Sequence, residues 1–217
     1  MATEGTDSTK GAEEQEKLAD LNTRDNLEAM LDELIEKPGD YDAIKERIET
    51  NFRQERTILI LDLSGFTRTT QLEGILPFLL MIHQMQRLAL PSVEGHGGIL
   101  VRADADNLTC LMDGVEDAIT AAKEITERLA TANVILPSSR DLYVSIGIGH
   151  GRILNVDNEA IFGNQVNLAS KLGEDLAESG DVLLTEAAYA QIEESGIKCE
   201  KHEVNISGVE LTYYSVL

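Results

Sequence analysis

Residues 56–67 read Arg-Thr-Ile-Leu-Ile-Leu-Asp-Leu-Ser-Gly-Phe-Thr, and this stretch decides the fold. The unbroken apolar run at 57–61 is typical of a strand that is buried on both faces. Asp62 ends the run, and the residues after it predict a tight turn into a helix. A carboxylate at the end of a buried strand is costly unless a partner offsets its charge. Asp62 therefore either helps to hold a metal and a phosphate at the helix N-terminus, or it or Ser64 simply caps the helix.

The elements that follow this strand define the fold class. The apolar spacing predicts a helix over about 72–90, strands at 99–102 and 106–112, a helix at 115–132, a strand at 142–149, a helix at 162–176, a strand at 182–185, a helix at 186–194 and two terminal strands. The first six elements from residue 56 have the order β-α-β-β-α-β, which is the ferredoxin-like split βαβ arrangement. We therefore expect an α+β fold with extra C-terminal strands.

The N-terminal quarter has a different composition. Residues 1–22 are polar and acidic and predict a disordered tail. Residues 23–55 carry apolar side chains at helical spacing on both sides of a Pro38-Gly39 break, which predicts a helical arm. The arm is either a regulatory or dimerising element or a solvated lead-in, and residues 56–217 form the main domain.

Charge excludes several function classes. Of 217 residues, 18 are Lys or Arg and 39 are Asp or Glu, which gives a net charge of −21. This balance argues against a sequence-independent nucleic-acid binder and against docking on an anionic membrane.

The chain has neither a run of 18 apolar residues nor a signal-peptide pattern at its start, and its two cysteines, Cys110 and Cys199, match no disulfide framework. We therefore expect a cytoplasmic protein with reduced thiols.

A second aspartate strengthens the metal hypothesis. Asp106 begins the second strand of the predicted hairpin, and that hairpin is expected beside the strand that Asp62 ends. Two neighbouring carboxylates repel each other unless a cation lies between them. The pair therefore predicts Mg²⁺ or Mn²⁺, with two ions able to activate an attacking oxygen and neutralise a leaving phosphate. Solvated turn aspartates are the simpler alternative.

Three segments resemble motifs of the class III nucleotidyl cyclases. Residues 61–67 are similar to the first metal motif of that family, F-x-D-I-x-G-F-T. Residues 97–106, Gly-Gly-Ile-Leu-Val-Arg-Ala-Asp-Ala-Asp, resemble G-G-x-x-V-K-x-x-G-D, and residues 162–172 resemble G-x-x-V-N-x-A-x-R-L. The three segments fall in the family's order, and the resemblance covers roughly residues 56–217.

The resemblance implies an activity and a set of roles. In that family two catalytic domains pair head to tail, the ribose 3′-oxygen attacks the α-phosphorus of a nucleoside triphosphate, and pyrophosphate leaves. It implies a homodimer with composite active sites, each of which takes its metal-binding carboxylates from one subunit and its base-binding and transition-state residues from the other. Asn167 would orient the ribose from the facing subunit. By the same resemblance the metal ligands are Asp62, Asp106 and the Leu63 carbonyl, and the triphosphate contacts are the backbone amides of Gly65, Phe66 and Thr67.

Departures from the family motifs bear on the base. Arg102 replaces the family's adenine-recognising Lys, and Ala160 replaces its base-recognising Asp. Arg is a donor only and suits a carbonyl edge, and Ala160 offers no acceptor for an exocyclic amine. The pattern resembles the pyrimidine cyclases of bacterial antiphage systems and favours UTP, with cyclic UMP as product. An adenylate cyclase in which a backbone carbonyl replaces the missing Asp is the alternative.

Two further departures reduce positive charge at the expected site. Lys171 replaces the family's transition-state Arg, which keeps the charge but loses the bidentate fork. Ser207 replaces a phosphate-binding Lys. A degenerate nucleotide-binding sensor is therefore the rival to an enzyme.

Overall fold

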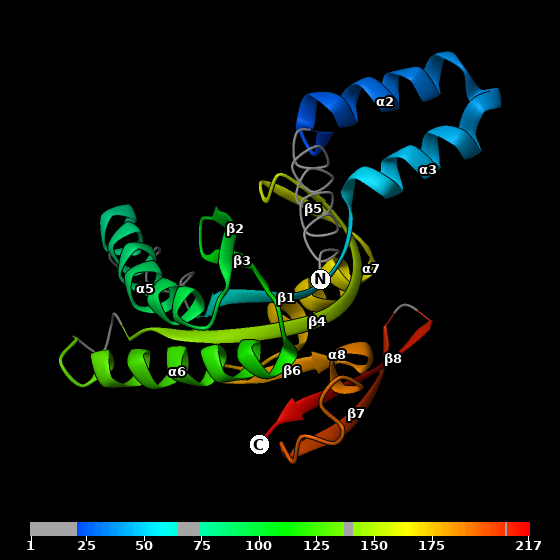
Figure 1. Cartoon of the computed structure of the whole chain (residues 1–217). Helices are drawn as coiled ribbons and strands as arrows, with labels where there is room; N and C mark the ends of the chain where they lie inside the picture. Colours follow the sequence, from blue (N-terminus) through cyan, green and yellow to red (C-terminus); the bar gives the residue numbers. More distant parts are fainter. Residues whose placement is uncertain (1–20, 65–73, 137–140, 207) are drawn as a thin grey trace, which may run out of the picture. The chain divides into compact units, whose positions relative to one another are not determined.

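The computed structural model describes residues 21–64, 74–136, 141–206 and 208–217 (Figure 1). The chain divides into two compact units. The smaller one comprises residues 1–54 and 153–162, and the larger one comprises residues 55–152 and 163–217. Residues 153–162, which fall inside the predicted main domain, are thus grouped with the arm. The predicted disordered tail, except for its last two residues, lies outside the described residues.

The described residues form one eight-stranded sheet with the order β2-β3-β1-β4-β6-β8-β7, and β5 pairs with β4. The strands are β1 (Arg53–Ser64), β2 (Ile99–Asp104), β3 (Asn107–Met112), β4 (Tyr143–Val156), β5 (Ala160–Phe162), β6 (Val182–Thr185), β7 (Cys199–Ile206) and β8 (Val209–Val216). Helices α5 (Ile75–Gly95) and α6 (Val115–Asn133) connect β1 to β2 and β3 to β4. The β1-α5-β2-β3-α6-β4 part has the ferredoxin-like order, and β6, β7 and β8 extend it.

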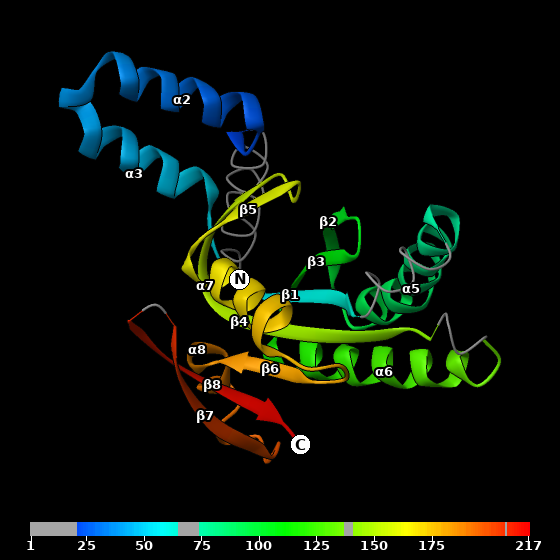
Figure 2. The same cartoon turned by 180° about the vertical axis from the view of Figure 1, so that it is seen from behind.

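The main core lies between the sheet and helices α5 and α6, whose side chains belong to the same cluster as those of β1, β3 and β4 (the elements are labelled in Figures 1 and 2). Alternate residues of β1, Leu59, Leu61 and Leu63, are fully buried in this core. Because successive strand residues point to opposite faces, Ile60 and Asp62 face the other side of the sheet.

That other side is covered by α7 (Asn164–Ser170) and the π-helical turn η3 (Lys171–Leu176). On β4, Ile146 and Ile148 belong to the main core, so Gly147 faces α7. A Cβ at Gly147 would lie 2.0 Å from the Ala169 carbonyl oxygen. Glycine here lets the helix backbone lie directly on the strand.

The smaller unit has its own apolar core. Helices α2 (Arg24–Glu36) and α3 (Tyr41–Phe52) form a hairpin around the turn η1 (Pro38–Asp40). Both helices pack on the β4–β5 hairpin through a cluster built on Met30, Ile44, Phe52 and Val156. The Thr23 side chain accepts a hydrogen bond from the Asn26 amide and so caps α2.

The structure differs from the expected elements in two places. The predicted helix over 162–176 begins only at Asn164, because β4 runs seven residues past the expected end at 149 and turns back through β5. The turn has Asp157 and Asn158 at positive φ, a conformation that these two residue types tolerate well. The predicted helix over 186–194 is regular only at α8 (Glu186–Tyr189). Among the described helices, none is long and apolar enough to cross a membrane.

Candidate functional site

Asp62 lies near the C-terminal end of β1, on the sheet face opposite α5 and α6. The register of β1 and β3 places it directly opposite Asn107. The register of β2 and β3 places Asn107 opposite Asp104. Residues directly opposite each other on antiparallel strands share a face. Asp104, Asn107 and Asp62 therefore form one polar row across three strands.

Asp106 reaches the same end of the sheet through the β2–β3 turn. Ala105 adopts a positive φ of 46° at the turn, where the similar cyclase motif has Gly. The Leu63 amide donates a hydrogen bond of 3.1 Å to the Asp106 carbonyl oxygen, which holds the turn against the end of β1. The structure thus brings Asp62, Leu63 and Asp106 together.

The charge at this edge is strongly negative. Burial, followed by the nearby carboxylates of Asp106 and Glu174, raises the pKa of the Asp62 carboxyl to about 7. The Asn107 side-chain oxygen is buried and has no hydrogen-bond partner among the described residues. Carboxylate and amide oxygens without donors are the ligands that Mg²⁺ and Mn²⁺ prefer, so these residues fit a divalent cation.

The described side chains alone do not complete a metal site at this edge. In the part of the chain that the structure describes, no three His, Cys, Asp or Glu side chains lie close enough together to hold an ion. Two carboxylates that need further ligands fit a metal that arrives with phosphate oxygens, as Mg²⁺ commonly does. The predicted triphosphate contacts, Gly65, Phe66 and Thr67, lie outside the described residues.

Arg102 lies on β2, on the same face as Asp62. Its guanidinium forms an ion pair with Asp104, and both side chains are largely exposed. The register places Arg102 opposite Thr109, which is itself opposite Ile60 of β1. Glu174 and Asp104 are the charged residues that sequence reasoning missed, because Glu174 lies outside the motifs and Asp104 stands at an unspecified position of the 97–106 motif.

Asn167 and Lys171 are carried by α7 and η3. The Asn167 amide closes the first turn of α7 on the Gly163 carbonyl oxygen at 3.2 Å. The Lys171 ammonium forms an ion pair with Asp175 one turn later. A Cβ at Gly173 would lie 3.1 Å from the Ile60 carbonyl oxygen, so η3 rests on β1 close to Asp62. This packing explains why Glu174 contributes to the electrostatics of Asp62.

Ala160 belongs to the smaller unit. It begins β5 opposite Val156 and packs, partly buried, against the apolar cluster of α2 and α3. This surrounding offers a structural reason for a small apolar side chain at the position where the cyclase motif has Asp. Ser207 lies outside the described residues.

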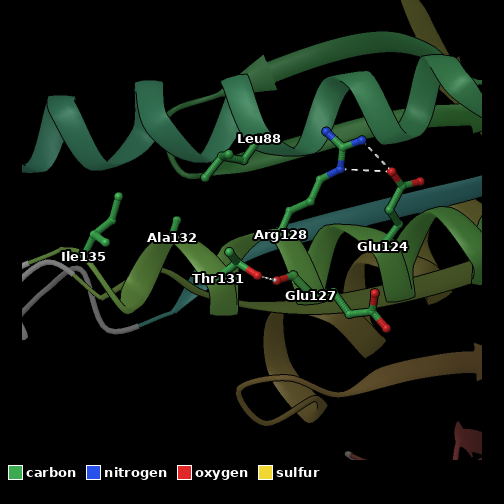
Figure 3. A pocket seen from close by; sticks show the side chains of 7 residues that line it. All are labelled: Leu88, Glu124, Glu127, Arg128, Thr131, Ala132 and Ile135. Carbon is green, nitrogen blue, oxygen red and sulfur yellow. Dashed lines mark hydrogen bonds and ion pairs between the residues drawn. The ribbon is translucent and has the colours of Figure 1, made fainter.

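A hollow between α5 and α6 lies away from this site (Figure 3). Its lining includes Leu88 and Ile135, and two of its charged side chains, Arg128 and Glu124, form an ion pair. Arg128 donates to Glu124, and the Thr131 hydroxyl donates to the Glu127 carbonyl oxygen. Because Leu88 and Ala132 come from the helix layer, the hollow opens on the side of the sheet opposite Asp62.

Comparison with curated proteins finds two distant relatives. The putative adenylate cyclase 3 of Rhizobium meliloti is 24% identical over 140 residues, which is 64% of this chain and 24% of that protein. The serine/threonine-protein kinase pkn2 of Myxococcus xanthus is 25% identical over 134 residues, which is 62% of this chain and 16% of that protein. The matches thus span about a quarter or less of the relatives' lengths. No protein-family model matches the chain.

Solved structures match the chain over more of its length than the curated relatives do. The catalytic core of a rhodopsin-guanylyl cyclase with converted specificity, in complex with ATPαS, has a TM-score of 0.65 at 15% identity and covers 76% of this chain and 98% of that chain. The adenylate/guanylate cyclase/hydrolase of Silicibacter pomeroyi has a TM-score of 0.65 at 21% identity, over 76% and 97% of the two chains. The α+β prediction is confirmed, and the fold is that of class III cyclase catalytic domains.

Proposed function

We propose that the chain is a metal-dependent class III nucleotidyl cyclase that converts a nucleoside triphosphate to a 3′,5′-cyclic nucleotide and pyrophosphate. The observation that carries this proposal is the convergence of Asp62, Leu63 and Asp106 at one edge of a cyclase-type sheet. The raised pKa of Asp62 adds support, because a site built to hold a cation is electrostatically unfavourable without it.

The residues divide the work of the reaction. Asp62, Asp106 and the Leu63 carbonyl would hold two divalent ions, which when bound would neutralise the triphosphate and favour the ribose 3′-oxygen as nucleophile. The Gly65, Phe66 and Thr67 amides would orient the phosphates. Asn167 would orient the ribose and Lys171 would offset the charge that develops on the phosphoryl oxygens. Such a transfer depends mainly on positioning and charge neutralisation.

For the substrate we favour UTP, with cyclic UMP as a signal in antiphage defence. Support comes from Arg102, whose side chain can only donate hydrogen bonds, and from Ala160, whose side chain packs in an apolar cluster and has no acceptor atom. The adenylate cyclase alternative is favoured by the curated relative from Rhizobium meliloti. We further propose a cytoplasmic homodimer in which each site takes its carboxylates from one protomer and Asn167 from the other.

A direct assay tests the proposal. The purified chain is incubated with ATP, GTP, CTP or UTP and with Mg²⁺ or Mn²⁺, and the products are identified by mass spectrometry. We expect a cyclic nucleotide, with UTP preferred over ATP by at least about tenfold in kcat/KM, which corresponds to the loss of one buried hydrogen-bond partner. Asp62→Ala and Asp106→Ala should lose this activity and keep the circular dichroism spectrum of the unmodified chain.

The outcomes separate the hypotheses. Turnover retained in either Asp variant would contradict the two-metal site. A preference for ATP would overturn only the base assignment. Nucleotide binding without any cyclic product would favour the nucleotide-binding sensor. The ion pair of Lys171 with Asp175 is the observation that would then support it, because Lys171 stands where the family has its transition-state Arg.

A further inference from the structure

Strand β2 presents a donor and an acceptor side by side on the face of Asp62. Arg102 and Asp104 are two residues apart, so their side chains point to the same face. Their ion pair joins the guanidinium Nε to a carboxylate oxygen, and the side chains are 66% and 60% exposed. Asp104 lies in the row that contains Asn107 and Asp62.

An extra residue in β2 causes this orientation. Leu100 lies opposite Cys110, but Arg102 lies opposite Thr109, so Val101 is left without a partner. In an unbroken ladder Arg102 would lie opposite Leu108, which is part of the core under α5 and α6. The bulge therefore turns Arg102 and Asp104 onto the Asp62 face. Bulges often redirect side chains in this way beside active sites.

The ion pair is well suited to be rearranged by a ligand. An exposed pair contributes little to stability because water screens both charges, so separating it costs little. Beside Asp104, the buried side-chain oxygen of Asn107 also has no donor in the part of the chain that the structure describes. This face thus combines one strong donor group with acceptors, which is the pattern that recognises a nucleobase edge rather than a phosphate.

We propose that Arg102 and Asp104 together recognise the nucleobase, with Asp104 as the acceptor that Ala160 does not supply; this inference rests on the proposed function. Arg102 donates to a carbonyl oxygen, and Asp104 accepts from the ring N–H beside it. Uracil offers this edge at O4 and N3–H, and guanine offers it at O6 and N1–H. Cytosine and adenine place an unprotonated ring nitrogen there, whose lone pair would face the carboxylate. The cyclase motif assigns no role to the position of Asp104.

The Asp104→Asn variant tests the assignment with almost no change in shape. An amide can accept from N3–H of uracil or donate to N3 of cytosine, so the variant should lose the discrimination at the ring nitrogen, while Arg102 keeps its own preference for the uracil carbonyl over the cytosine amino group. The probes are 3′-deoxy-UTP and 3′-deoxy-CTP, which lack the attacking hydroxyl, and their affinities are measured by titration calorimetry with Mg²⁺ present. We expect the unmodified chain to prefer the uridine analogue by at least about tenfold, and Asp104→Asn to lower this affinity ratio by at least about threefold, since Arg102 still contributes its share.

A control is available in a second Arg–Asp ion pair, in which the Asp side chain is 73% exposed and the Arg side chain is partly buried. Arg56 and Asp113 form an ion pair of 2.7 Å after the far end of β3. Asp113→Asn should leave the uridine-to-cytidine affinity ratio unchanged. Circular dichroism checks that each variant folds.

Two results would overturn the inference: equal affinity of the unmodified chain for the two analogues, or a ratio that Asp104→Asn leaves unchanged. Because binding does not require turnover, the failure of this inference is distinguishable from that of the proposed function. A chain that makes no cyclic product, but whose uridine-to-cytidine affinity ratio falls in Asp104→Asn, would lack the activity and keep the base recognition. A chain that cyclises nucleotides, but whose uridine-to-cytidine affinity ratio is the same in Asp104→Asn, would have the proposed activity without base recognition by Asp104.

Discussion

Asp62 is the residue whose surroundings conflict most with its charge. Burial and two neighbouring carboxylates raise its pKa to about 7 in the folded chain, against 3.8 for an ordinary aspartate. The folded state therefore binds more protons than the unfolded state between these values. In the absence of divalent ions, the stability that comes from protonated Asp62 is fully present below about pH 3.8 and is lost as the pH rises through about 7.

Asp62→Asn should remove this pH dependence because the amide does not ionise. Between pH 5.5 and 8.5, in EDTA, we expect the unmodified chain to lose about 1–2 kcal/mol more unfolding free energy than the variant. This figure allows for solvent screening of a half-exposed group. Urea unfolding monitored by circular dichroism at both pH values measures the difference. Parallel pH dependence of the two proteins would contradict the raised pKa.

At the residue scale, the sequence predicts part of the site because the order of the strands and helices along the chain determines which residues become neighbours. Asp62 ends a strand and Asp106 begins the neighbouring hairpin strand, so their proximity follows from the βαββ order alone. Glu174 lies far along the chain, and only the packing of η3 on β1 brings it near Asp62. Asp104 lies in one row with Asn107 and Asp62 only because of the bulge at Val101, and no local residue pattern predicts this bulge.

At the element scale, the long strands and helices were predictable from apolar periodicity, and the β4–β5 hairpin was missed. The pair Asp157-Asn158 was the available signal, since both residues readily take the left-handed conformation found there. The Asn155 side chain holds this turn through hydrogen bonds with the side chain and the amide of Asn158. A strand of three residues leaves too short a pattern to detect without the turn.

The contact between β4 and α7 should depend on glycine. In Gly147→Ala the new Cβ would meet the Ala169 carbonyl oxygen at 2.0 Å and the Gly173 amide nitrogen at 2.6 Å, both of them backbone atoms. We expect a loss of about 3 kcal/mol in unfolding free energy, because α7 and η3 must move. Gly95→Ala is the control, since nothing lies within 4 Å of its Cβ. Urea unfolding of both variants provides the measurement, and equal stabilities would contradict the close packing.

At the scale of the whole molecule, the net charge of −21 works against the proposed homodimer, because like charges repel at long range. Salt at physiological ionic strength screens charges separated by more than about 8 Å and should favour association. A two-fold dimer closes on itself and contains two equivalent sites. If each site combines Asp62 of one protomer with Asn167 of the other, the two residues of one chain serve different sites.

Mixing inactive chains tests this sharing. With random exchange, half of the dimers in an equal mixture of Asp62→Ala and Asn167→Ala chains are heterodimers, and each of these has one intact site. We therefore expect about a quarter of the unmodified activity, measured as cyclic nucleotide release at 150 mM salt. A mixture of Asp62→Ala and Asp106→Ala chains is the matched control, because every site then lacks one carboxylate and stays inactive. Absence of recovery in the first mixture, with heterodimers verified by mass spectrometry, would show that each site is complete within one chain.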